Sequence, residues 1–190
     1  MYLARLGRLP EAFVAVQRAQ ELDVLSLMIN ANLASLWYYA RQWCQAAEQA
    51  ARTLEINPTF WYARALVGMV CEQQGRWDEA IAEYQQVLDV TKEPWRAWLL
   101  ARGYALAGRH GEAREVLARL QQLARDSFLS PTLLAAVHVP LGQTDQALAC
   151  LEKAVQERDS YLIYLKVDPK YDPLREDPRF ADVLRRIGLA

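Results

Sequence analysis

The chain has 190 residues, of which 53% are hydrophobic and 24% charged, so it holds enough apolar side chains to form a core and does not belong to the disordered class. Its 22 Lys and Arg residues nearly balance its 23 Asp and Glu residues, and the net charge of -1 gives no overall field that would attract nucleic acid. The longest apolar stretches, at 66–71 and 133–142, are shorter than the roughly 20 residues that cross a bilayer, so we expect neither a nucleic-acid partner nor a membrane partner.

The first predicted element is a turn at residues 7–12, GRLPEA, followed by an amphipathic helix over roughly 10–22. Charges at Arg5, Arg8 and Glu11 interrupt the leading residues, which therefore lack the continuous apolar core of a secretory signal. No partner helix fits before the turn, so one apolar face of the predicted helix has no neighbour within residues 1–26. We expect this face to be covered by the short leading segment, by a second copy of the chain in a homodimer, or by sequence upstream in a longer protein.

Near variants of GRLPEA return along the chain, as RQWCQA at 41–46, GRWDEA at 75–80, GRHGEA at 108–113 and GQTDQA at 142–147. The successive intervals are 34, 34, 33 and 34 residues, a regularity that indicates a repeat architecture. Apolar side chains recur at helical spacing on both sides of the phrase in residues 61–93, and Gly75 can take the positive φ that ends a helix. Each phrase is therefore predicted to join two antiparallel helices, which cross closely at its last residue: Ala12, Ala46, Ala80, Ala113 and Ala147.

The predicted first helices align on a small residue of their own, at Ala34, Gly68, Ala101 and Ala135. At these residues the chain resembles the tetratricopeptide repeat (TPR) family, whose pattern W-x2-L-G-x2-Y…A-x3-F…P has a period of 34 residues. Pro58 fills the family's proline position, whereas the family tryptophan is replaced by Asn30, Arg64, Ala97 and Pro131.

The resemblance implies an all-α fold, an α-solenoid in which antiparallel helix-turn-helix hairpins form a right-handed superhelix with a C-terminal capping helix. It implies one array over residues 1–190, divided into a partial repeat at 1–26, repeats at 27–60, 61–93, 94–127 and 128–161, and a capping segment at 162–190.

The predicted capping segment breaks at Asp168-Pro169 and Asp172-Pro173 and restarts after Asp177. Asp before Pro is a helix-start signal, so these carboxylates are interpreted as caps or turn residues and not as metal ligands. A helical stripe of apolar residues then follows, at Phe180, Val183, Leu184 and Ile187. Residues 165–189 also resemble the tails of bacterial TPR arrays that are fused to transcription regulators, nucleotide cyclases or protein kinases. This implies an alternative function, as the C-terminal regulatory or dimerisation region of a bacterial multidomain signalling protein.

The family resemblance implies a concave face lined by the first helices of the repeats. Here that face is aromatic and apolar with few charges, which favours a groove for an extended or helical peptide with hydrophobic anchors. The alternative for each residue is that it packs between repeats. A clamp for a peptide carboxylate is not expected, because Ala31, Ser35 and Ala65 stand where clamp-forming relatives carry Lys and Asn. The predicted groove residues are Met28, Ser35, Tyr38, Tyr62, Met69, Glu72, Trp95, Trp98 and Arg102.

No catalytic, cofactor or metal-binding constellation is legible. The three widely spaced cysteines, Cys44, Cys71 and Cys150, are interpreted as free thiols in a reducing compartment, which we expect to be the cytoplasm. His138 is interpreted as a packed, hydrogen-bonded residue, and Trp43 and Trp77 as core residues. We therefore predict a non-enzymatic module, without a cofactor, that binds a peptide or protein partner in the groove.

Overall fold

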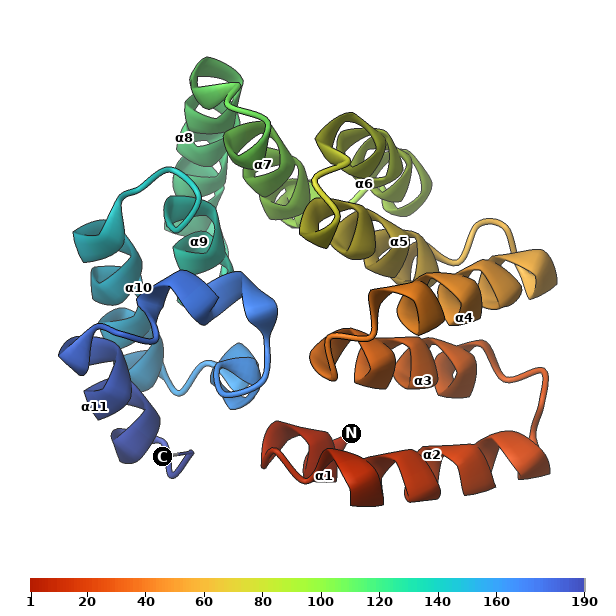
Figure 1. Cartoon of the computed structure of the whole chain (residues 1–190). Coiled ribbons are helices and arrows are strands. Elements are labelled where there is room, and N and C mark those ends of the chain that lie inside the picture. Colours follow the sequence, from red (N-terminus) through yellow and green to blue (C-terminus); the bar gives the residue numbers. More distant parts are fainter. Residues whose placement is uncertain (190) are drawn as a thin grey trace. The chain divides into compact units, whose positions relative to one another are not determined.

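The computed structural model describes residues 1–189, which form α- and 3-10 helices and no β-strand (Figure 1). The all-α fold class is therefore confirmed. The chain divides into two compact units, an N-terminal unit at Met1–Lys92 and a C-terminal unit at Glu93–Ala190, and each is described by itself. No helix within residues 1–189 has the length and apolarity needed to cross a membrane.

The N-terminal unit consists of a short leading helix, the helix α2 and two complete hairpins. The short helix α1 (Tyr2–Arg5) precedes α2 (Leu9–Leu22), so one helical turn does occur before the first predicted turn, where we expected none. The hairpins are α3 (Leu27–Tyr39) with α4 (Trp43–Ile56), and α5 (Trp61–Gln73) with α6 (Trp77–Thr91). Helix α2 packs on α3, and α4 packs on α5, so each helix contacts its neighbours in sequence order.

The C-terminal unit holds two further hairpins and the predicted capping segment. The 3-10 helix η1 (Pro94–Arg96) leads into the hairpin of α7 (Ala97–Leu106) and α8 (His110–Asp126). The hairpin of α9 (Pro131–His138) and α10 (Thr144–Glu157) follows. The segment after α10 forms two 3-10 helices, η2 (Ser160–Tyr164) and η3 (Pro169–Leu174), before α11 (Pro178–Arg186) packs on α10.

Each recurrence of the six-residue phrase forms the same turn. Its first residue has positive φ in all five copies, with values of 79° at Gly7, 63° at Arg41, 72° at Gly75, 73° at Gly108 and 69° at Gly142. Its second residue donates its backbone N–H to the carbonyl oxygen five residues earlier, as from Arg76 to Cys71 at 2.9 Å. This bond satisfies a carbonyl at the end of the first helix, so the predicted role of the phrase as a helix-ending turn is confirmed.

The left-handed backbone at Gly75 predicts a substitution effect. Gly75→Ala should cost about 1 kcal/mol of folding free energy, because a side chain disfavours positive φ even where no atom lies within 4 Å of the added Cβ. Gly111→Ala is the matched control, since its added Cβ also meets nothing within 4 Å and its φ is not positive. Thermal unfolding followed by circular dichroism should show a lower midpoint for the first variant only. Equal midpoints for the two variants would contradict the turn assignment.

The two helices of each hairpin cross at small side chains. The five alanines that end the phrase are at most 1% exposed, as expected for residues at a close helix crossing. The approach is close in the α5–α6 hairpin, where a Cβ built on Gly68 would lie 2.4 Å from Cε1 of Tyr84. Tyr84 itself is fully buried, and its hydroxyl donates to Glu72 Oε1 at 2.8 Å. The absence of a side chain at Gly68 therefore makes room for the Tyr84 ring.

This contact predicts that Gly68→Ala destabilises the α5–α6 hairpin. The added methyl group overlaps the Tyr84 ring, and overpacking of this kind costs roughly 1–3 kcal/mol. Combining it with Tyr84→Leu should recover part of the loss, because the repeat register places Ala101 and Leu117 at the equivalent positions. Chemical denaturation measures both effects. A single variant as stable as the parent chain would remove the Gly68–Tyr84 contact as a constraint on the hairpin.

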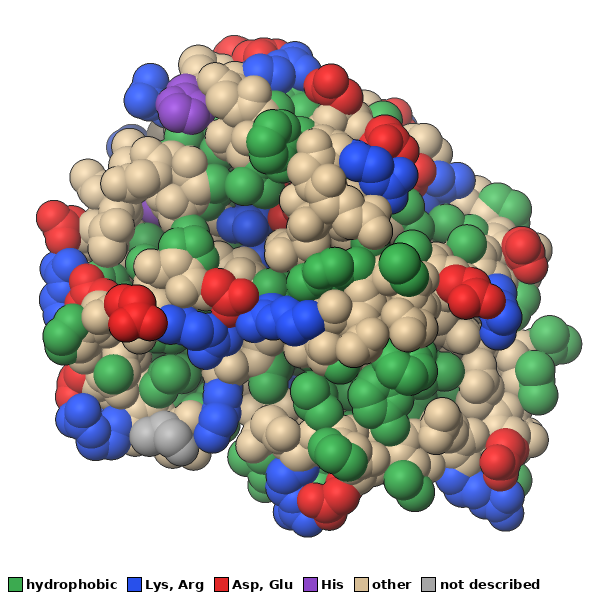
Figure 2. Space-filling model, viewed as in Figure 1, with side chains coloured by type: hydrophobic (Ala, Val, Ile, Leu, Met, Phe, Trp, Pro, Cys, Tyr) green, Lys and Arg blue, Asp and Glu red, His purple; other side chains and the backbone are tan. Residues whose placement is uncertain are grey.

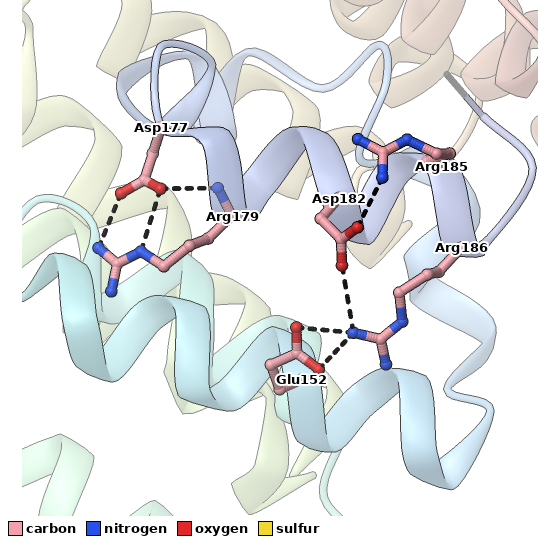
Figure 3. A network of polar contacts seen from close by, with 6 residues as sticks. All are labelled: Glu152, Asp177, Arg179, Asp182, Arg185 and Arg186. Carbon is pink, nitrogen blue, oxygen red and sulfur yellow. Dashed lines mark hydrogen bonds and ion pairs between the residues drawn. The ribbon is translucent and has the colours of Figure 1, made fainter.

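The capping helix continues the repeat register of the C-terminal unit. Helix α11 begins at Pro178, 34 residues after the start of α10 at Thr144. Two ion pairs join residues that are 34 positions apart, Arg179 with Asp145 at 2.8 Å and Arg186 with Glu152 at 2.7 Å. Figure 3 shows Arg186 of α11 reaching Glu152 on α10. The segment thus ends in a helix placed like the second helix of a further repeat, with charged residues on its exposed side.

The prediction that Trp77 is a core residue is wrong. Trp77 is 42% exposed, whereas Trp43 is half-buried with its ring centroid 5.5 Å from that of Tyr38. Trp77 is the first residue of α6, at the turn end of its hairpin, and its neighbours Arg76 and Asp78 are exposed. A large part of its ring therefore remains open to solvent.

Candidate functional site

In the N-terminal unit, the predicted groove residues lie on α3 and α5, and most of them are buried. Ser35, Tyr38, Met69 and Glu72 are buried, Tyr62 is half-buried, and Met28 is 53% exposed. Burial of Glu72 is accompanied by the hydrogen bond from the Tyr84 hydroxyl. Met28 and Tyr62 are therefore the predicted residues of this unit with substantial accessible surface.

A hydrogen bond between neighbouring first helices fixes the position of Tyr62. Ser35 Oγ lies 2.9 Å from the carbonyl oxygen of Ala31 and 2.8 Å from Tyr62 Oη. The serine has a single hydroxyl proton, which it donates to Ala31, so Tyr62 donates to Ser35. Because its hydroxyl is held in this way, the Tyr62 ring is pre-oriented between α3 and α5.

In the C-terminal unit, Trp98 and Arg102 are buried and Trp95 is half-buried. Arg102 Nη1 donates to the carbonyl oxygen of Ala136 at 2.8 Å, which links α7 to α9. The guanidinium of Arg96 lies 4.3 Å from the centroid of the Trp95 ring, within the range of a cation–π contact. The predicted groove residues of this unit thus make structural contacts, and Trp95 alone among the three keeps substantial exposure.

Two residues that the sequence reasoning missed lie against this set. Lys170 Nζ is 5.9 Å from the centroid of the Trp98 ring, and the Tyr171 hydroxyl donates to the carbonyl oxygen of Thr132 at 2.9 Å. Helical periodicity gives no signal for them, because they belong to the short 3-10 helix η3, which begins at the Asp168-Pro169 break. The role of the nine groove residues in partner binding stays a prediction, and the structure adds that six of them are buried.

Asp168 and Asp177 cap the helices that begin after them, whereas the predicted break at Asp172-Pro173 is wrong, because η3 runs through both residues. Asp168 accepts from the backbone N–H of Lys170 at 3.0 Å and Asp177 from that of Arg179 at 2.9 Å, which confirms their predicted role. Asp172, within η3, forms an ion pair at 2.7 Å with Arg175, the residue that follows η3. Across residues 1–189, no group of three or more His, Cys, Asp or Glu side chains is arranged to hold a metal ion.

The cysteines and His138 show no arrangement for nucleophilic chemistry. All three cysteines are free, and burial raises the pKa of the Cys71 and Cys150 thiols, which keeps them protonated and weakly reactive. His138 is buried, and its Nδ1 donates to Gln143 Oε1 at 2.7 Å, so the prediction of a packed, hydrogen-bonded histidine is confirmed. Cys71, Cys150 and His138 therefore pack within the fold, whereas Cys44 is exposed.

Solved structures with the same fold cover between 80% and 99% of the chain. A thermophilic TPR protein from Thermus thermophilus is 18% identical with a TM-score of 0.67, covering 96% of this chain and 94% of that one. A tetratricopeptide repeat protein from Parabacteroides merdae is 22% identical with a TM-score of 0.65, covering 99% and 75%. MamA is 16% identical with a TM-score of 0.54, covering 80% and 90%. At these identities the likeness concerns the fold alone.

The sequence also matches models of a protein family. No curated protein sequence matches the chain. Three models described as tetratricopeptide repeat match residues 32–94, 72–137 and 132–161, and so cover the four complete hairpins almost entirely. Together with the recurring turn, the buried alanines and the helical hairpins, these matches show that the chain belongs to the tetratricopeptide repeat family.

Proposed function

We propose that this chain is a non-enzymatic module that binds a peptide or protein partner through aromatic and apolar side chains of its first helices. We propose the cytoplasm as its location. The TPR fold is in general a protein-interaction module, which supports the class of function. The observation that carries the finer proposal is the accessible surface left on two predicted groove residues, Met28 and Tyr62. Both belong to first helices of the N-terminal unit, both keep accessible surface, and the Tyr62 ring is held by Ser35.

The chemistry of this surface favours a partner with apolar anchors. Figure 2 shows hydrophobic side chains gathered over α3 and the adjoining edge of α2 on the viewed face. These helices also carry half-buried Phe13 and Trp37, whose ring centroids are 4.3 Å apart. Rigid aromatic side chains lose little conformational entropy on binding and dominate the energetics of many interfaces. An extended or helical peptide with aromatic or long aliphatic side chains fits this description.

The test begins with selection of binding peptides from a displayed library on the full chain. For a selected peptide, Tyr62→Ala should weaken binding by at least tenfold, because truncation of an aromatic anchor costs about 2 kcal/mol. Tyr2→Ala is the matched control, since Tyr2 is exposed on α1 and lies outside the predicted groove. Calorimetry measures both affinities. Equal affinities for the Tyr62 variant and the parent chain would exclude Tyr62 as an anchor.

A second candidate role is self-association through α2. Val14 is 69% exposed and Leu22 is 76% exposed, and the loop after α2 adds exposed Val24 and Leu25. Several exposed apolar side chains on one helix and the loop that follows it are typical of a surface that another chain covers. We propose a homodimer in which two copies of α2 bury this surface, and this role is compatible with a regulatory or dimerisation region of a larger signalling protein.

Self-association predicts a concentration-dependent mass. At micromolar concentration the chain should scatter light as a dimer, and Val14→Glu should shift it to the monomer because a charge at an apolar interface is costly to bury. Its helical content should stay unchanged, since the Val14 side chain is exposed on α2. A parent chain that is monomeric over the whole concentration range would refute the dimer.

A further inference from the structure

One surface predicted to receive a partner is already covered by the chain itself. We name it the α7–α9 face and define it by Trp98 and Arg102 on α7 and Thr132 and Ala136 on α9. All four residues are buried, and Arg102 joins the two helices through its hydrogen bond to Ala136. The register of the repeats places Thr132 and Ala136, like Trp98 and Arg102, at positions of the first helices that the family resemblance assigns to the groove.

The covering segment is η3 and the residue before it. Lys170 directs its ammonium group to the Trp98 ring, with Nζ 5.9 Å from the centroid, while the Tyr171 hydroxyl donates to the backbone carbonyl of Thr132 at 2.9 Å. Asp168 Oδ2 lies 2.8 Å from Lys170 Nζ, so the buried positive charge of the lysine is balanced by a carboxylate. Each of these three residues is buried. Two side chains of the segment thus meet the face through a cation–π contact and a hydrogen bond, the contacts that a bound peptide would make.

The segment is held in a defined shape by its own contacts. Arg175 Nη2 donates to the carbonyl oxygen of Lys166 at 2.9 Å and so closes the loop on itself, and the Tyr171 ring stacks on Phe180 of α11 with centroids 6.5 Å apart. Burial raises the pKa of Tyr171 well above its usual value, and the nearby Asp168 carboxylate adds to the shift. The hydroxyl therefore stays protonated, as a donor to Thr132 must.

We propose that residues 168–171, Asp-Pro-Lys-Tyr, are an internal ligand of the α7–α9 face, and that an external segment with the same chemistry competes with them for it. That chemistry is a lysine ammonium next to a tyrosine hydroxyl within one tight turn. The inference rests on the proposed function, because it concerns how the groove residues Trp98 and Arg102 become accessible to a partner. While residues 168–171 make these contacts, the face is occupied by the chain itself.

The covalent attachment of the internal ligand sets the strength that a competitor needs. A tethered segment acts at an effective concentration on the order of millimolar, so a free peptide with the same contacts competes only at similar concentration. Weakening the internal contacts lowers that threshold. The face should then become accessible to solvent and to added peptide.

The test uses a reporter thiol on the face in the full chain. Thr132→Cys is close to isosteric, and Cys44→Ser removes the exposed thiol. In this background, Lys170→Ala with Tyr171→Phe should accelerate labelling of the reporter by a disulfide reagent at least tenfold, with the labelled position read by mass spectrometry. Buried Cys71, in the other unit, is the internal control for folding and should label at an unchanged rate. Arg186→Ala, which breaks an exposed ion pair of α11 with α10, is the matched control and should leave reporter labelling unchanged.

A peptide then tests the acceptor chemistry. A synthetic peptide with the sequence of residues 166–175, KVDPKYDPLR, at millimolar concentration should slow reporter labelling in the loosened variant at least threefold. The same peptide with phenylalanine in place of tyrosine should protect less, because it lacks the donor to Thr132. If the double variant loses helical signal, Tyr171→Phe alone takes its place with the same expected direction.

The outcomes separate this inference from the proposed function. Reporter labelling that is equal in the loosened variant and the parent background would overturn the covering of the face, and a peptide without protective effect would overturn the internal-ligand role. Neither measurement depends on a partner bound at Met28 and Tyr62. Conversely, if Tyr62→Ala did not weaken peptide binding, the expected labelling rates would be unchanged. The proposed function and the internal-ligand inference are therefore refuted by different experiments.

Discussion

The close crossing of two helices just after a left-handed turn is the constraint on which each hairpin depends. The turn needs positive φ at its first residue, and the crossing needs a side chain no larger than methyl five residues later, as at Gly75 and Ala80. Where the second helix carries a large ring at the crossing, as Tyr84 does, the first helix compensates with Gly68. Arg41 meets the turn requirement without being glycine, so that hairpin carries backbone strain that the other turns avoid.

Repetition of this hairpin brings equivalent residues of successive repeats together within the C-terminal unit. Arg102 reaches Ala136, and Arg186 reaches Glu152, each across 34 positions of sequence. Such contacts follow from stacking identical units, in which each repeat touches only its neighbours. The capping segment uses the same geometry, since α11 begins one period after α10 although the intervening residues form 3-10 helices. Exposed ion pairs join α11 to α10 and give this helix a charged surface.

The same stacking determines which side chains remain accessible to a partner. Side chains on first helices make contacts between repeats, as Ser35 does with Tyr62, or contact the capping segment, as Trp98 does with Lys170. The Ser35 hydroxyl and the Arg102 guanidinium are hydrogen-bonded inside the fold, where an unpaired buried polar atom would be costly. Among the predicted groove residues of the N-terminal unit, Met28 is exposed and Tyr62 is half-buried, so these two keep surface that a partner can reach.

The sequence by itself determined the repeat period, the turn positions, the alanines at the crossings and the family, because these depend on contacts between residues close in sequence and recur in every copy. It did not determine the exposure of Trp77 or the burial of six of the nine groove residues, since exposure depends on what other helices cover. Only the tertiary structure placed Tyr171 on Thr132, 39 positions away. That contact occurs once, in a segment without helical periodicity, so no repeated pattern could reveal it. Periodic sequence specifies the hairpin, whereas the irregular segment η3 is positioned by the surface against which it packs.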